Sequence, residues 1–172
     1  QRPQHAFFQG RPLPITLDGY YYLSLARDLL EGTYADLDTL RGVPAPPPRP
    51  TPPPLLALMT AAIARWTTWP LEWIAALLPP LLGVGLAAPL VLLGRLYGGR
   101  LMALVAVAMG LFPRYYVYRS HLGWFDTDCL NVTLLLTVCY LFIRFGLTPG
   151  PRRYAYLAGG LAVYLLFMLW WD

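Results

Sequence analysis

The feature that most constrains this chain is an apolar run with no charged residue from Trp73 through Gly94. A helix needs roughly 20 apolar residues to cross the hydrocarbon of a bilayer, so this run is long enough to span a membrane. The composition agrees, because 57% of the 172 residues are hydrophobic and 13% are charged, whereas a soluble domain carries about 25% charged residues. The sequence therefore predicts an all-α polytopic membrane protein.

Four segments are long enough to be spanning helices: residues 73–97, 101–118, 129–145 and 154–171. Before them, "PLLALMTAAIA" offers about a dozen uncharged residues, a length typical of an interfacial or re-entrant helix. We expect residues 1–72 to form a first external loop with an amphipathic helix and this short interfacial helix. Residues 73–172 then form the transmembrane region, with a second external loop at 119–128. The abrupt ends of the sequence suggest a piece of a longer protein.

The positions of arginine predict the orientation. Arg95 and Arg100 bracket the turn after the first span, and Arg144, Arg152 and Arg153 bracket the turn after the third. By the positive-inside rule both turns face the cytoplasm. The stretch "GWFDTD" and everything before Trp73 then face the periplasm or cell exterior of a multi-pass inner-membrane protein. The outward-facing arginines weaken this pattern; they include Arg27, Arg114 and Arg119.

The stretch "LDGYYYLSLARDLLEG" has polar residues at helical spacing and predicts an amphipathic helix from Gly19 to Glu31. Gly32 is a plausible C-terminal cap, and Asp18 stands where an N-cap belongs. Capping alone explains Asp18 as well as a functional role does.

Asp126 and Asp128 stand where the third span begins. Each has a simple structural explanation, Asp126 as a cap and Asp128 as a first-turn acid favoured by the helix dipole. Two strong spans separate Asp126 from Asp18, and an even number returns both to the same side. Three carboxylates brought together there would suit Mg²⁺ or Mn²⁺ and leave coordination positions for substrate oxygens.

Other residues near these acids have competing explanations. Arg119 could balance the carboxylates or reach an anionic substrate, but it could also be an arginine snorkelling to the interface. His121 is interpreted as a polar loop residue. Asn131 begins an "NVT" glycosylation pattern that we dismiss because it falls within a predicted membrane helix. Trp170 and Trp171 are interpreted as part of the aromatic belt.

The pair of stretches "DGYYYLSLARDLLEG" and "YRSHLGWFDTDCL" resembles the catalytic subunit of oligosaccharyltransferase, and its Asp-x-Asp form is closest to the bacterial single-subunit type. The resemblance implies a C-type glycosyltransferase transmembrane fold, here a fragment with about four spanning helices. It also implies inverting, metal-dependent transfer of an oligosaccharide from a polyprenyl pyrophosphate to the asparagine amide of an Asn-x-Ser/Thr site. The partners are then the lipid-linked oligosaccharide, an acceptor protein or peptide and the lipid bilayer, with no nucleic acid.

By the same resemblance, Asp18 and Asp126 match metal ligands for Mn²⁺ or Mg²⁺, and Asp128 matches a further ligand or a residue that supports the ligands. Arg119 matches an arginine that precedes the second motif. The family's later external glutamate, its soluble domain with a Trp-Trp-Asp motif and its first membrane helix have no counterpart in this sequence. We therefore expect the chain alone to be inactive.

Two alternatives remain open. Another C-type polyprenyl-phosphate sugar transferase would also place an acid in its first external loop. A membrane transporter or scaffold could use the same acids to bind ions or to cap helices.

Overall fold

The computed structural model describes residues 7–39, 41–42 and 44–170; Trp171, assigned above to the fourth span, lies outside them. The described residues are mostly helical, which confirms the predicted all-α class. The chain divides into two compact units, Gln1–Pro79 with Leu122–Asp126, and Pro80–His121 with Thr127–Trp171. Residues 122–126, which belong to the expected second external loop, are part of the first unit.

The first unit begins with a short hairpin of β1 (Phe7–Phe8) and β2 (Arg11–Pro12). Phe7 pairs with Pro12 and Phe8 with Arg11. Gln9 and Gly10 connect the strands with φ values of 50° and 75°, as a type I′ turn requires. Two arginines of this unit, Arg11 and Arg27, donate to Glu72 at the start of α3 (Leu71–Val84), with nitrogen–oxygen distances of 3.3 and 3.1 Å.

Helices α1 (Leu17–Glu31) and α2 (Leu55–Thr67) form the core of the first unit. Their facing sides are apolar, and Leu25, Leu56 and Ala57 are fully buried or nearly so. Gly32 ends α1 with a φ of 73°, a left-handed conformation that favours glycine. The predicted amphipathic helix with its glycine cap is confirmed, and the short helix expected from "PLLALMTAAIA" is present as α2.

The proline-rich segment between α1 and α2 is held by specific contacts. Arg49, only 6% exposed in its side chain, donates to Asp28 at 2.7 Å. The Tyr34 hydroxyl donates to the Pro50 carbonyl at 2.9 Å. This segment is therefore fastened against the polar side of α1.

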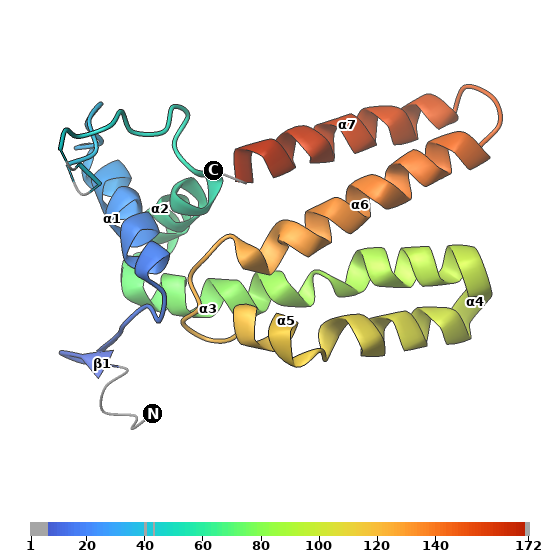
Figure 1. Cartoon of the computed structure of the whole chain (residues 1–172), viewed down its shortest axis with the longest axis horizontal. Coiled ribbons are helices and arrows are strands. Elements are labelled where there is room, and N and C mark those ends of the chain that lie inside the picture. Colours follow the sequence, from blue (N-terminus) through green and yellow to red (C-terminus); the bar gives the residue numbers. More distant parts are fainter. Residues whose placement is uncertain (1–6, 40, 43, 171–172) are drawn as a thin grey trace. The chain divides into compact units, whose positions relative to one another are not determined.

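By length and composition, three helical stretches of the described residues could cross a membrane: residues 71–111, 128–147 and 153–170. The first contains α3 (Leu71–Val84) and α4 (Ala87–Leu111) and is 41 residues long, enough for about 60 Å of helix, or twice the bilayer hydrocarbon. It is not one straight rod. Gly98 and Gly99 leave helical geometry, with a φ of 72° at Gly99, and Figure 1 shows the chain reversing direction within α4.

The two arms of α4 pack closely because small residues line their contact. A Cβ atom added to Gly94 would lie 2.4 Å from the Cα of Ala103, and one added to Gly110 would lie 2.4 Å from Leu90 Cδ1. Such close backbone approach through small residues is typical of membrane helix pairs. The reversal at Gly98 and Gly99 agrees with the predicted boundary between the first two spans.

The prediction that residues 101–118 form one continuous helix is wrong. Helix α4 ends at Leu111, and a separate short helix, α5 (Arg114–Arg119), follows Pro113. Proline has no N–H to continue the ladder and clashes with the preceding turn, which explains the break. The first predicted span is also interrupted, at Gly85 and Leu86, where the amide of each residue bonds the carbonyl three residues before it.

Helices α6 (Asp128–Leu147) and α7 (Arg153–Trp170) form an antiparallel pair, which Figure 1 shows side by side over their length. The two are joined by a short turn in which Gly150 has a φ of 74°. A Cβ added to Gly160 would lie 3.5 Å from the Cβ of Leu141, so α7 is in contact with α6 at this glycine. Because the pair is antiparallel, the end of α7 returns to the start of α6.

Candidate functional site

Asp18 lies in the first turn of α1 and is exposed. The interpretation of Asp18 as the N-cap is wrong, because Thr16 caps this helix and its hydroxyl accepts the Gly19 N–H at 2.9 Å. Threonine at this position satisfies one of the unpaired amides of the first turn. The Asp18 carboxylate is therefore not needed as the cap, although its charge still suits the positive end of the helix.

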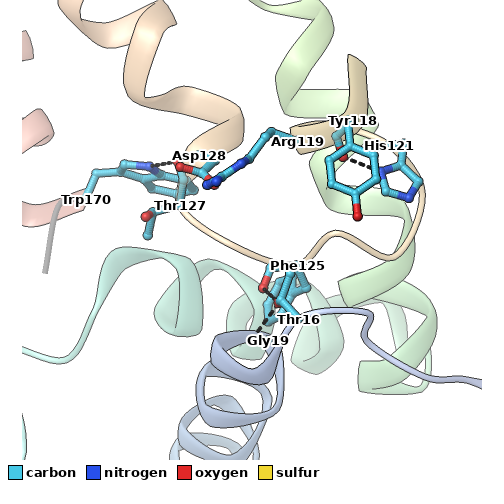
Figure 2. A network of polar contacts seen from close by, with 9 residues as sticks. All are labelled: Thr16, Gly19, Tyr118, Arg119, His121, Phe125, Thr127, Asp128 and Trp170. Atoms are coloured by element: carbon cyan, nitrogen blue, oxygen red, sulfur yellow. Dashed lines mark hydrogen bonds and ion pairs between the residues drawn. The ribbon is translucent and has the colours of Figure 1, made fainter. Parts of the chain in front are cut away.

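The start of α1 is bonded to the segment that precedes Asp126. Thr16 Oγ1 donates to the Phe125 carbonyl at 3.2 Å, and the Ile15 amide donates to the Gly123 carbonyl at 3.0 Å. Figure 2 shows Thr16 between the Gly19 amide and the Phe125 carbonyl. One hydroxyl thus accepts one bond and donates another, which uses both of its functions.

This connection is tightly packed. Phe125 is fully buried, and its ring meets Tyr22 edge to face, with centroids 6.5 Å apart. A Cβ at position 19 would lie 2.7 Å from Thr16 Oγ1 and 2.9 Å from the Phe125 carbonyl oxygen, so only glycine fits there. The structure therefore brings together the segments that carry Asp18 and Asp126, and Asp126 itself is half-buried.

Asp128 is the first residue of α6, as expected for a first-turn acid, and Thr127 is the N-cap. Arg119 donates from Nη1 to Asp128 Oδ2, and the same guanidinium lies 4.9 Å from the centre of the Tyr115 ring. The pair is half-buried, with 35% of the Arg119 side chain and 26% of the Asp128 side chain exposed. Arg119 thus balances one of the predicted carboxylates within the second unit.

Arg119 and Asp128 also border a cavity of about 320 Å³ in the second unit. Its other walls are mostly apolar and come from α4, α5 and α6. They are Leu86, Leu90, Gly110, Pro113, Tyr115, Tyr116, Asn131, Val132 and Leu136. Asn131 lies within α6, as the sequence analysis expected. The cavity combines an apolar interior with one ion pair at its edge.

The placement of the acids bears on whether they could hold a metal ion. Among the described residues, no three His, Cys, Asp or Glu side chains are placed to hold one metal ion. Two of the three predicted acids lie on segments bonded to each other, and their hard oxygens suit Mg²⁺ or Mn²⁺. Asp128 falls in the other unit, where it is paired with Arg119. The oxygen donors of Asp18 and Asp126 are of the type that a divalent cation prefers, but the described part of the chain holds no group of three such residues around one point.

Two further side chains surround the acidic turn. His121 contacts the Tyr118 carbonyl through Nδ1 and stacks on the Tyr118 ring, with centroids 5.4 Å apart, which agrees with its interpretation as a polar loop residue. Trp170 is different, because its side chain is fully buried and its indole N–H donates to the Thr127 carbonyl at 2.8 Å. Its interpretation as a belt residue is wrong, and nothing in "LWWD" alone indicates this contact.

Comparison with known proteins adds a further observation to this geometry. Residues 4–172 match the family described as oligosaccharyl transferase STT3, N-terminal. The chain belongs to the STT3 family. This result confirms the resemblance inferred from the two acidic motifs.

Two curated relatives share the same coverage. Each is an undecaprenyl-diphosphooligosaccharide–protein glycotransferase, one from Campylobacter jejuni subsp. jejuni serotype O:2 and one from Campylobacter jejuni strain RM1221. Each is 24% identical to this chain over 165 residues, or 96% of the chain. The chain spans 21% of the length of these STT3 relatives.

Proposed function

We propose that the parent protein of this chain transfers an oligosaccharide from a polyprenyl-pyrophosphate carrier to the side-chain amide of asparagine in an Asn-x-Ser/Thr site, with inversion. Membership of the STT3 family supports transfer to protein. The observation that carries the proposal is the bond from Thr16 to the Phe125 carbonyl, because it joins the segments of the two acids that the family resemblance identifies as catalytic.

The proposed role of Asp18 and Asp126 is to surround the reacting amide with negative charge. An amide nitrogen is a poor nucleophile because its lone pair is delocalised into the carbonyl group. Carboxylates that accept both N–H bonds would hold the amide in place and favour a less conjugated nitrogen. A bound Mn²⁺ or Mg²⁺ would supply charge neutralisation for the departing pyrophosphate.

The proposed role of Arg119 is electrostatic. Its pairing with Asp128 orients that carboxylate at the start of α6, and the remaining N–H donors of the guanidinium can meet an anionic substrate. A planar guanidinium suits this work because it offers five donors and stays charged. We propose that this pair has a supporting role in the reaction.

The proposed orientation places the acids at the periplasmic or external face of an inner-membrane protein. It rests on Arg95 and Arg100 at the reversal of α4, and on Arg144, Arg152 and Arg153 around the turn between α6 and α7. Arginine at these turns favours retention in the cytoplasm. Because the chain spans 21% of its relatives' length, we also propose that it is inactive alone.

The test uses the full-length parent protein with a lipid-linked oligosaccharide and a fluorescent peptide that contains an Asn-x-Thr site. Wild type is expected to shift the peptide on a gel with Mn²⁺ and not with a chelator. Asp18→Asn and Asp126→Asn are each expected to slow transfer by about 100-fold or more, since loss of one electrostatic group at a reacting centre typically costs this much.

The matched control is Glu31→Gln, which removes one exposed acid from the last turn of the same helix and is expected to leave the rate unchanged. A wild-type protein that glycosylates no peptide contradicts the proposal. Transfer that survives both aspartate substitutions would show instead that the two acids are structural.

A further inference from the structure

Trp170 is the residue whose position the proposed reaction does not yet explain. It lies in the last turn of α7, its side chain has no exposed surface, and its indole Nε1 lies 2.8 Å from the Thr127 carbonyl oxygen. Figure 2 shows the indole reaching the peptide that joins Thr127 to Asp128. A buried tryptophan N–H usually finds a partner, but this partner lies between two acids.

The Thr127 carbonyl is held by the start of α6 as well as by the indole. It accepts the Leu130 amide at 3.2 Å. Thr127 provides no side-chain cap for this helix. The indole adds a donor from another helix, and these bonds together restrain the plane of the peptide between residues 127 and 128.

The orientation of this peptide affects where Asp128 points. Thr127 has a ψ of −17°, and rotation about this angle would turn the backbone of Asp128, which is the next residue. Asp128 is also held by Arg119, so its carboxylate is restrained through its side chain and, by way of Trp170, through its backbone.

The α6–α7 pair explains why the indole arrives at this point. Gly160 packs against Leu141 and Phe142 near the middle of the pair, and the short turn at residues 148–152 closes it. This packing determines the register, so the last turn of α7 meets the first turn of α6. A slip of one helical turn, about 5.4 Å, would separate the indole from the carbonyl.

We infer that Trp170 is a positioning residue for Asp128: its indole N–H orients the Thr127 peptide and thereby the carboxylate of Asp128. This inference rests on the proposed function, because it assigns Asp128 to the support of a cation and substrate site. The indole itself touches neither. Its effect is to keep Asp128 oriented before a cation or substrate arrives, which lowers the cost of ordering it on binding.

The test uses Trp170→Phe in the full-length protein, because this substitution removes the N–H donor and keeps an aromatic ring. One net hydrogen bond corresponds to roughly 3- to 10-fold in an equilibrium constant. We therefore expect the Mn²⁺ concentration for half-maximal transfer to rise by about 3- to 10-fold, with the rate at saturating Mn²⁺ changed by less than about twofold. Direct Mn²⁺ titration by electron paramagnetic resonance, without substrate, is expected to show the same rise.

Two further variants distinguish the effect of losing the hydrogen bond from the effect of losing side-chain volume. Trp170→His keeps a ring N–H and is expected to recover part of the Mn²⁺ affinity that Trp170→Phe loses. Trp66→Phe changes an exposed tryptophan at the end of α2, 89% exposed, and is expected to change nothing. If Trp170→Phe does not fold, Trp170→His and Trp170→Leu repeat the comparison of a donor with a non-donor.

The outcomes distinguish this inference from the proposed function. Wild type that transfers sugar and binds Mn²⁺, together with a Trp170→Phe variant of unchanged Mn²⁺ affinity, overturns the role of Trp170 and leaves the transferase proposal standing. Wild type that transfers no sugar overturns the proposed function. In that case, a weaker Mn²⁺ affinity in Trp170→Phe than in wild type would still support the orienting role of the indole.

Discussion

The starts of α1 and α6 carry similar sequences but are held in different ways. In each, a threonine is the N-cap and an aspartate lies in the first turn, Thr16 and Asp18 in α1, Thr127 and Asp128 in α6. The Thr16 hydroxyl caps its own helix and donates to Phe125. At Thr127 the backbone carbonyl accepts the distant Trp170 indole. The start of α1 is held by the side chain of its own N-cap residue, whereas the start of α6 is held by a side chain from α7.

The difference shows how much each site depends on distant sequence. The cap of α1 is local, because Thr16 and Gly19 are three residues apart. The contact at α6 joins residues 127 and 170 and requires the whole α6–α7 pair to have the right register. Substitutions near α1 should therefore act directly, whereas those at α6 should act through packing and orientation.

Among substitutions that leave the acids in place, the largest effect is expected from Gly19→Ala. The added methyl would lie within 3 Å of Thr16 Oγ1, the Phe125 carbonyl and Pro14 Cβ, so the segment before Asp126 must move. Overpacking of this kind costs about 1–3 kcal/mol, and we expect transfer by the full-length protein to fall by more than about tenfold, as misplaced catalytic groups usually cause. Thermal unfolding and transfer rate measure the two effects.

Gly146→Ala is the matched control for that change, because a Cβ at this position of α6 meets nothing within 4 Å. It is expected to be neutral or slightly stabilising, since alanine favours a helix over glycine. A Gly19→Ala protein as stable and active as this control would show that the packing between α1 and Phe125 accommodates the added methyl group without loss.

An intermediate effect is expected at the two threonines. Thr16→Val removes both the cap and the bond to Phe125 and is expected to lower the free energy of unfolding by about 1–2 kcal/mol. Thr16→Ser keeps the hydroxyl and is expected to retain most of the stability. Thr127→Val is expected to cost less than about 1 kcal/mol, because its side chain makes no capping bond. Denaturant unfolding of the full-length proteins in detergent tests this order.

Equal losses at Thr16 and Thr127 would contradict the comparison directly. They would mean that both helix starts depend on their own side chains, and the indole contact at Thr127 would then be secondary.

The smallest effect is expected from the pairing of Arg119 with Asp128. A double-mutant cycle of Arg119→Gln and Asp128→Asn is expected to give a coupling energy of about 0.5–1.5 kcal/mol, because the pair is charge-assisted but partly exposed. Thermal unfolding at low and high salt measures it, and the coupling should decrease with salt. A coupling near zero would remove Arg119 as a support for the acidic turn.

The sequence predicted well where the determining residues are close together. The amphipathic pattern and Gly32 located α1 and its end, and arginine-flanked apolar runs located the membrane segments. The sequence left capping open as an explanation of Asp18 because Thr16, two residues earlier, also suits that position, and single-residue helix boundaries are poorly determined by pattern. The reversal at Gly98 and Gly99 agreed with a predicted boundary because glycine and arginine both mark it.

The sequence predicted less where the structure depends on partners far along the chain. Pro113 was visible, yet the break at that point was missed because proline is tolerated within membrane helices when neighbours satisfy the backbone. The contact of Trp170 with Thr127 had no local indication, since a tryptophan at the end of an apolar run is also typical of an interfacial belt. Only the register of α6 against α7 distinguishes the two.

The paired interruptions of the α4 hairpin have a mechanical consequence. The two arms of the hairpin pack tightly at the contacts of Gly94 with Ala103 and Gly110 with Leu90, so we expect the hairpin to move as one rigid unit. The backbone is irregular at the open end of this hairpin, between α3 and α4 and again at Pro113. The Tyr116 hydroxyl of α5 links these two places, because it donates to the Gly83 carbonyl at 2.7 Å and also lies 3.4 Å from the Cys129 carbonyl oxygen of α6. These contacts hold α5, which ends in Arg119, against α3 and the start of α6.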